Sequence, residues 1–245
     1  MRILIIRHGE PDYAHDTLTE KGWREAELLA ERLEKEKIDK IYVSPLGRAR
    51  DTAKPTLIRK GMEATVCDWL QEFPVRVDRS DMNAGKNYVL WDWLPDHWTE
   101  SDEFYDAEKW TSGPIIKDSN AKEELEKVKR GFDELLASHG YVREKKYYRA
   151  VEPNTDTIAF FCHFGLECVL LAHLMSISPM PLWHGLCAPT SSITTVYTEE
   201  RREGIASFRA FGFGDTSHLY AAGEPLSFAA RWRETYDDPS GEIMI

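Results

Sequence analysis

The chain has 245 residues, 42% of them hydrophobic, and a formal net charge of −11. This length can bury a full core and fits one large α/β domain or two small ones. The acidic excess argues against a nucleic acid or an anionic membrane as the main partner, although a local cationic pocket could still bind a small anionic substrate.

The cysteines and the apolar runs indicate the compartment. The cysteines show neither a C-x-x-C pair nor a metal-binding spacing, so we interpret them as reduced thiols. The apolar run at 3–6 is too short for a signal peptide, and no segment approaches the roughly 20 apolar residues of a membrane span. We therefore expect a cytoplasmic protein. The cysteines are Cys67, Cys162, Cys168 and Cys187.

The first third of the chain alternates short apolar runs, typical of buried strands, with segments in which apolar residues recur at helical spacing. Ser44-Pro45 predicts a helix start, because serine is a favoured N-cap and proline a favoured first helical residue. The predicted elements are strands at 2–6, 41–43 and 64–66, a helix through 23–33 after capping residues at 16–20, and a helix from Ser44-Pro45 to about 59.

The pattern becomes irregular from about 73 to 120. Tryptophans stand there among acidic residues, and Pro95 and Pro114 interrupt any long element, so we expect an insertion of short helices or loops. Regular patterns then return. They predict a helix with an apolar stripe at 125–135, a strand at 157–162 with a helix behind it, and strands at 193–198 and 205–211.

Strands that alternate with helices predict an α/β fold, a three-layer α/β/α sandwich with a mostly parallel central sheet. We expect residues 1–245 to form one domain with an insertion at about 73–120. In such sheets the ligand crevice lies beyond the carboxyl ends of the strands. Arg7-His8 and His163 directly follow two predicted strands, and Arg48 lies one turn beyond Ser44. These side chains should therefore converge.

Two arginines around a histidine predict an anion site. Arg48 lies in the first turn of its helix, and helical side chains lean toward the helix N-terminus, so its guanidinium should point at the strand ends. With Arg7 it offers forked donors that favour phosphate or carboxylate. The same positive charge should disfavour the imidazolium form of His8, which leaves a neutral ring able to act as a nucleophile.

Four ordered motifs carry a family resemblance that covers nearly the whole chain. The sequence resembles the histidine phosphatase superfamily, also called phosphoglycerate mutase-like, whose RHG signature follows an N-terminal strand. The motifs are Arg7-His8-Gly9-Glu10, Leu18-Thr19 with Gly22, Ser44 to Ala53 in the pattern S-x-L-x-R-A-x-x-T-A, and Cys162-His163-Phe164-Gly165.

The resemblance implies a phosphoric monoester hydrolase, similar to histidine acid phosphatases, that acts on a small phosphorylated metabolite. His8 would attack phosphorus and become a phosphohistidine. Arg7, Arg48 and His163, the last as an imidazolium, would hold the non-bridging oxygens as charge moves in the transition state. A carboxylic acid would protonate the leaving oxygen and then activate water. The resemblance implies no metal and no cofactor.

The carboxylic acid has several candidates. Relatives often place it in an L-x-E segment, which Leu70-Gln71-Glu72 fits, so Glu72 is our choice. The usual glycine and Trp-Glu-Gly downstream are missing, and Pro74 follows almost at once. Glu10 is the rival because it lies near His8 in sequence. Asp68 and the carboxylates of the tryptophan-rich stretch stay open.

The motifs and the late part of the chain offer further candidates for substrate binding. Glu10, Ser192 and His218 join Arg7, Arg48 and His163 in this set. The segment Pro189-Thr190-Ser191-Ser192 stands where relatives often have N-x-S. His218 belongs to an ending that resembles the G-D-x-S-H-L of some relatives. The tryptophans of the insertion either pack the core or roof the phosphate site, and in the second case they favour an apolar or polyol leaving group.

Two other functions compete with hydrolysis. A phosphoglycerate mutase-type phosphotransferase would carry a longer loop with a W-N signature after its RHGES, whereas here RHGEP reaches Leu18-Thr19 within eight residues. A non-catalytic phosphate-binding module would lack the carboxylic acid. The late strand pair could close the sheet edge or join a second copy, so a homodimer is also open.

Overall fold

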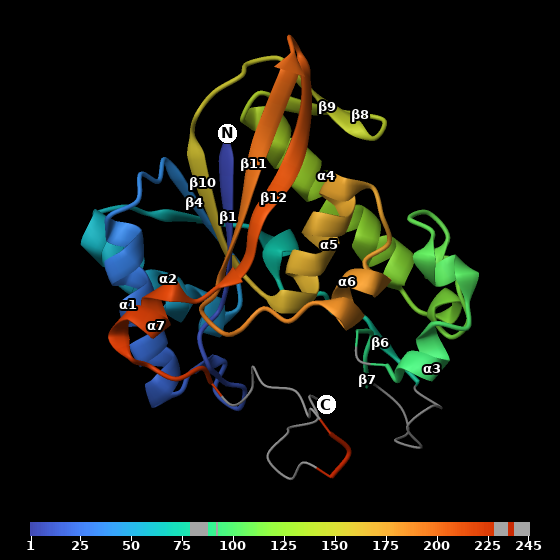
Figure 1. Cartoon of the computed structure of the whole chain (residues 1–245), viewed down its shortest axis with the longest axis horizontal. Helices are drawn as coiled ribbons and strands as arrows, with labels where there is room; N and C mark the ends of the chain where they lie inside the picture. The colour runs from blue at the N-terminus through green and yellow to red at the C-terminus, as the bar shows by residue number, and fades with distance from the viewer. Residues whose placement is uncertain (79–87, 92, 228–234, 238–245) are drawn as a thin grey trace.

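The computed structural model describes residues 1–78, 88–91, 93–227 and 235–237. Its main sheet has eight strands in the order β5-β4-β10-β1-β11-β12-β9-β8 (Figure 1). The strands are β1 (Arg2–Arg7), β4 (Lys40–Val43), β5 (Ala64–Val66), β8 (Tyr141–Glu144), β9 (Tyr147–Ala150), β10 (Thr157–Cys162), β11 (Ile193–Arg202) and β12 (Ile205–Asp215).

The sheet has a parallel half and an antiparallel half. β1, β10, β4 and β5 run parallel. β11, β12, β9 and β8 continue the sheet from β1 in antiparallel pairs. The α/β prediction is confirmed. Parallel order holds among β1, β10, β4 and β5, where α1 connects β1 to β4 and α2 connects β4 to β5 as parallel pairing requires.

Helices cover both faces of the sheet (Figure 1). Successive side chains of a strand point to opposite faces. Accordingly, Ile3 and Ile5 join one apolar cluster, whereas Leu4 and Ile6 join another. The molecule therefore has three layers, with the sheet between two layers of helices, as the sequence predicts. The helices are α1 (Glu20–Glu34), α2 (Gly47–Lys60) and α7 (Ser217–Ala222) on one side, and α4 (Ala121–Ser138), α5 (Phe164–Met175) and α6 (Met180–Gly185) on the other.

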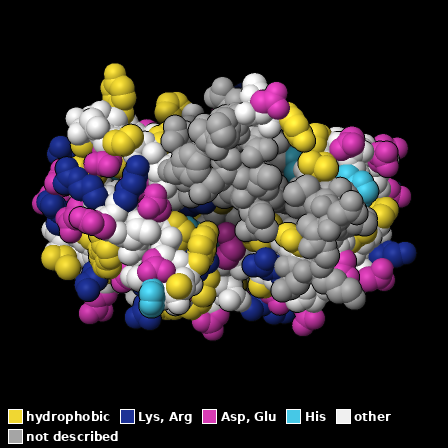
Figure 2. Space-filling view, turned by 90° about the horizontal axis from the view of Figure 1, so that it is seen from below, with side chains coloured by type: hydrophobic (Ala, Val, Ile, Leu, Met, Phe, Trp, Pro, Cys, Tyr) yellow, Lys and Arg dark blue, Asp and Glu magenta, His cyan; other side chains and the backbone are white. Residues whose placement is uncertain are grey.

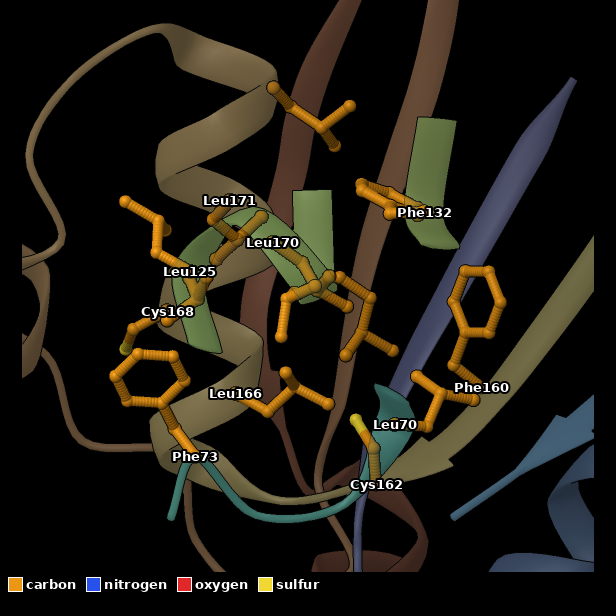
Figure 3. Close-up of a cluster of buried hydrophobic side chains, with 14 of the residues drawn as sticks. Leu70, Phe73, Leu125, Phe132, Phe160, Cys162, Leu166, Cys168, Leu170 and Leu171 are labelled. Carbon is orange, nitrogen blue, oxygen red and sulfur yellow. The ribbon is translucent and has the colours of Figure 1, made fainter. Parts of the chain in front are cut away.

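The larger cluster fixes α5 against the sheet (Figure 3). Phe160 of β10 packs against Phe132 of α4, with ring centroids 5.9 Å apart. Leu166 and Leu170 of α5 are fully buried in the same cluster. This packing holds the first turn of α5 at the carboxyl end of β10.

The described residues between 73 and 120 form short elements, as the prolines of this segment predict. Its buried rings belong to the larger cluster, including Trp91, Trp93 and Trp110. The elements are β6 (Arg76–Val77), β7 (Tyr88–Val89), α3 (Pro95–Trp98) and the 3-10 turns η2 (Asp102–Tyr105), η3 (Trp110–Ser112) and η4 (Ile116–Asp118). A further 3-10 turn, η1 (Asp68–Leu70), precedes them.

Two sequence expectations need correction. Helix α2 begins at Gly47, two residues after Pro45, and its N-cap residue Leu46 has no side-chain cap. The Ser44 hydroxyl accepts a hydrogen bond from the Leu46 N–H and also bonds His163, so it serves the strand end instead of the helix start. The late strands do not form the sheet edge, because β12 pairs with β9 through Ile205 and Ala206.

The surface at the carboxyl end of β1 faces the viewer in Figure 2. Over the described residues seen there, basic and acidic side chains are interspersed, so this face shows no broad basic patch of the kind that binds nucleic acid. Within the described part of the chain, no helix is long and apolar enough to cross a membrane.

Candidate active site

The ends of β1 and β10 bring Arg7, His8 and His163 together. The two strands are parallel neighbours with Arg7 opposite Cys162. The His8 N–H then donates to the Cys162 carbonyl at 3.0 Å. As a result the His8 and His163 rings lie with centroids 5.1 Å apart, and both are almost fully buried.

One hydrogen bond fixes the tautomer of His8. Its Nδ1 lies 2.7 Å from the Gly9 carbonyl, which can only accept, so Nδ1 carries the proton and Nε2 is left with a lone pair. Burial lowers the pKa of His8 well below its ordinary value, and the charges of Arg7 and Arg48 lower it further. The neutral ring expected from the two arginines is therefore present, with burial as the larger cause.

His163 is the N-cap residue of α5 and bonds the Ser44 hydroxyl through Nε2 at 2.8 Å. Burial lowers its pKa well below the ordinary value, and His8, Arg48 and Arg7 lower it further. These effects favour the neutral ring in the free site. The imidazolium expected from the family resemblance stays a prediction for the phosphate-bound site, because a positive charge here needs the negative charge of a bound anion to offset it.

Arg7 is held from two sides. Its Nη1 donates to the Ala188 carbonyl at 2.5 Å, and its guanidinium carbon lies 5.8 Å from the centre of the Phe164 ring. The backbone N–H of Arg7 donates to the Ser192 carbonyl at 3.1 Å. These contacts fix the orientation of the buried Arg7 guanidinium. The backbone pairing of the sheet alone would leave this side chain free to rotate.

Arg48 lies in the first turn of α2, as the sequence predicts. Its Nη1 donates to Asp16 Oδ1 at 2.7 Å, and the side chain is only 12% exposed. The Tyr13 ring lies 5.4 Å from its guanidinium carbon. Asp16 also accepts the Gly47 N–H at 2.6 Å, so one carboxylate both caps α2 and orients Arg48.

Glu72 lies at the N-terminus of α5, beside His163. Its Oε1 accepts the N–H groups of Phe73 at 2.9 Å and Leu166 at 3.0 Å. Part of the residue stays exposed. Burial of the carboxyl raises its pKa, and the two N–H bonds, Arg48 and Arg7 oppose that shift only in part. A carboxyl that favours its protonated form thus shares the site with both arginines.

The rival carboxylates point elsewhere. Glu10 accepts hydrogen bonds from the hydroxyls of Thr19, at 2.8 Å, and Ser227, and its charge acts on Glu25. Asp68 is exposed, as is Asp96 in the tryptophan-rich stretch. Asp92 lies outside the described residues. Among the described carboxylates named from the sequence, the geometry brings Glu72 to the two arginines.

The remaining substrate-binding candidates are Ser192 and His218. Ser192 is buried at the start of β11, and its hydroxyl has no hydrogen-bond partner among the described residues. His218 bonds the Ser191 hydroxyl through Nε2 at 2.9 Å, while the Ser191 N–H donates to the His8 carbonyl at 3.0 Å. His218 lines a separate cavity beside α1. The structure therefore links it to His8 through Ser191.

One buried carboxyl escaped sequence analysis. Glu167 follows His163 by one helical turn and is 1% exposed. Burial raises its pKa to about 7, with Thr194 and Arg7 lowering it and Glu72 raising it. The available signal was the position of this acid in the first turn of the helix that follows His163. Asp16 offered no such signal, because its partner lies on another helix.

Two arginines, two buried histidines and a carboxyl whose pKa is raised by burial, all near the carboxyl ends of parallel strands, define a phosphoryl-transfer enzyme. The family model of the histidine phosphatase superfamily (branch 1) matches residues 3–209. The chain belongs to this family, which confirms the resemblance and the prediction of a phosphatase.

Known proteins of similar sequence and structure agree with this assignment. The chain is 30% identical over 216 residues to "Putative phosphoserine phosphatase 2" of Hydrogenobacter thermophilus, covering 83% of this chain and 93% of that protein. It is 25% identical over 216 residues to "Phosphoserine phosphatase 1" of the same organism, covering 84% and 90%.

Two solved structures share the fold. A phosphoserine phosphatase mutant from Entamoeba histolytica in complex with phosphoserine superposes with a TM-score of 0.59 at 18% identity, covering 89% of this chain and 98% of that one. A mycobacterial glucosyl-3-phosphoglycerate phosphatase in complex with VO3 gives 0.56 at 22% identity, covering 86% and 98%.

Proposed function

We propose that this phosphatase hydrolyses a small phosphomonoester through a phosphohistidine on His8. The observation that carries the proposal is the fixed tautomer of His8, which leaves a lone pair on Nε2 of a buried ring that the charges of Arg7 and Arg48 both affect. Nε2 attacks phosphorus, and the bond from phosphorus to the ester oxygen breaks. A neutral imidazole at neutral pH performs this attack without a separate base.

The non-bridging oxygens are held by Arg7, Arg48 and His163. A phosphomonoester carries about −1.5 to −2 charges at neutral pH, so two guanidiniums nearly neutralise it. Its arrival raises the pKa of His163, which lets this ring take up a proton and donate to a phosphate oxygen. Preorganised donors of this kind stabilise the charge that moves onto the oxygens in the transition state.

Glu72 supplies the proton to the leaving oxygen and then takes one from the attacking water. Burial keeps its carboxyl protonated to higher pH than an exposed glutamate, which suits the first step. A water molecule then cleaves the phosphorus–nitrogen bond and releases inorganic phosphate. The presence of this carboxyl beside Arg7 and Arg48 counts against the alternative of a non-catalytic phosphate-binding module.

The substrate class rests on relatives. Both Hydrogenobacter relatives are named phosphoserine phosphatases, which supports a small phosphorylated metabolite as the substrate. We further propose that residues 1–245 form a single domain, because buried rings of the 73–120 insertion share a core cluster with β10. Cytoplasmic location and a homodimer stay predictions from the sequence.

The test is hydrolysis of 4-nitrophenyl phosphate by a His8→Ala variant. We expect activity to be abolished, together with the acid-labile phosphoprotein that rapid quenching should trap in the wild type. The matched control is His139→Gln. His139 lies at the other end of the sheet, where its carbonyl bonds Asn154 and the Asn154 carbonyl accepts from the Met1 amino group at 2.7 Å. Retained activity in His8→Ala would overturn the proposal.

A further inference from the structure

An aromatic cavity is lined by residues of α3 and α6 and of the chain segments next to these two helices. Its volume is about 360 Å³, enough for a leaving group of one or two rings. Three of its tryptophans are buried, and Trp98 is the half-buried outer wall. The lining residues are Trp91, Trp93, Pro95, Trp98, Trp183, His184, Gly185, Leu186 and Cys187.

Gly165 joins this cavity to the active site. A Cβ at this position would lie 2.7 Å from Glu72 Oε1 and 3.0 Å from the Trp91 ring. The Glu72 carboxyl and the Trp91 indole therefore both pack against the backbone of Gly165. Trp183 Nε1 donates to the Gly165 carbonyl at 2.9 Å. The proposed proton donor therefore lies at the boundary between the phosphate pocket and the cavity.

Arg7 marks a second junction. It donates to the carbonyl of Ala188, the residue that directly follows the cavity residues Leu186 and Cys187. One continuous stretch of chain thus lines the cavity and then fixes a phosphate-binding arginine. An ester bound with its phosphate at Arg7 and its bridging oxygen at Glu72 would extend into the tryptophan cavity.

Among the described residues of the cavity wall there is no lysine, arginine or carboxylate. His184 is held as a neutral tautomer, because its Nδ1 donates to the Met180 carbonyl at 2.7 Å and its Nε2 accepts the Trp93 N–H at 3.2 Å. Its ring stacks on Trp98 at 4.7 Å and 19°. A bound carboxylate would find no lysine or arginine among these described residues, whereas a flat apolar ring face would stack on the indoles.

We infer that the alcohol part of the substrate is an uncharged, ring-bearing group held in this cavity. The inference rests on the proposed function and narrows it. It disfavours phosphoserine, whose ammonium could face an indole but whose carboxylate would stay unpaired in the described wall. An aromatic alcohol and a sugar both present a flat apolar face, so both are tested.

The experiment compares kcat/KM for 1-naphthyl phosphate, glucose 6-phosphate, phosphoserine and phosphocholine in the wild type, Trp98→Ala, Trp98→Phe and Trp23→Ala. Trp23 is a half-buried tryptophan of α1, away from the cavity. We expect at least one ring ester to be preferred, and Trp98→Ala to lower its kcat/KM about tenfold, the effect of losing one stacking face. Trp98→Phe should restore most of the loss, and phosphoserine should change less than twofold.

Preference for phosphoserine or phosphocholine, or equal effects of Trp98→Ala on all four esters, would overturn the inference. Binding to the His8→Ala variant separates it from the proposed function. By calorimetry, the preferred ring ester should bind this variant about tenfold more tightly than inorganic phosphate, and Trp98→Ala in that background should remove the gain. Hydrolysis that persists in His8→Ala would refute the phosphohistidine mechanism while leaving the binding result to decide the cavity's role.

Discussion

The proposed nucleophile His8 is prepared by a backbone contact with the next residue. The Gly9 carbonyl holds the proton on Nδ1, and burial with two nearby guanidiniums keeps the ring neutral. The same residue is also anchored through the Ser191 N–H, which bonds its carbonyl. The reactive state is therefore set before any substrate arrives.

The first prediction concerns the proton donor. Glu72→Gln should lower kcat for an alkyl phosphate by about 100-fold or more, the contribution of a general acid. The loss should be much smaller with 4-nitrophenyl phosphate, because 4-nitrophenolate leaves without a proton. Steady-state kinetics on both esters measures the difference. Glu10→Gln is the matched control, and a larger loss in that variant would assign the acid to Glu10.

The second prediction concerns pH and Glu167. Its pKa is raised from 4.5 to about 7, so the folded state holds a proton that the unfolded chain has lost in this window. Stability contributed by this group is present below pH 4.5 and is lost as pH rises toward 7. The full difference is equivalent to about 3 kcal/mol at most.

Glu167→Gln should remove this loss. The free energy of unfolding should be measured with urea at pH 5 and pH 8. Between these pH values, the difference between the variant and the wild type should shift in favour of the variant by up to about 3 kcal/mol. The exposed Glu123→Gln on α4 serves as the control and should follow the wild type. An identical difference between Glu167→Gln and wild type at both pH values would contradict the buried-carboxyl argument.

At the scale of elements, α2 depends on a residue from outside itself. Its N-cap Leu46 offers no side-chain acceptor, and Asp16, from the hairpin formed by β2 (Pro11–Asp12) and β3 (Thr17–Leu18), accepts the Gly47 N–H instead. The same carboxylate occupies one edge of the Arg48 guanidinium. The start of the helix and the aim of its arginine are thus coupled.

The third prediction separates these two effects. Asp16→Ala should lower the free energy of unfolding by about 1 kcal/mol through the lost cap. It should also raise KM about tenfold, because Arg48 loses a charged partner that orients it. Asp16→Asn keeps an acceptor for the Gly47 N–H, so it should recover stability but only part of the KM change. Equal KM in all three proteins would show that Asp16 has no orienting role.

The predictability of the elements follows from their periodicity. Strands β1 and β10 are continuous apolar runs because both faces are covered, and they were predicted from sequence. β8 and β9 form an antiparallel pair in which exposed Arg149 stands between buried Tyr148 and Ala150, and the polar residue Arg143 pairs with Tyr148 across the strands. Sequence analysis assigned no strand there, since the run is short and half polar.

For the whole molecule, the site divides into a predictable part and an unpredictable part. Arg7, His8 and His163 could be placed together because parallel strands end at one edge, and Arg48 because its helix starts there. The partnership of Asp16 with Arg48 could not, because hairpin and helix meet only in the folded chain. The tryptophan cavity joins residues about 90 positions apart, which no local pattern reports.

The residues of the proposed phosphate site and those of the tryptophan cavity come from different segments of the chain, which bears on how the substrate preference can change. The proposed phosphate-binding residues Arg7, His8, Arg48 and His163 come from strand ends and helix starts, which the core fixes. The described wall of the tryptophan cavity comes from α3, α6 and the residues next to them, outside the sheet. Grafting other sequences at 91–98 and 183–187 should therefore change which alcohol the enzyme accepts without changing the phosphoryl-transfer step.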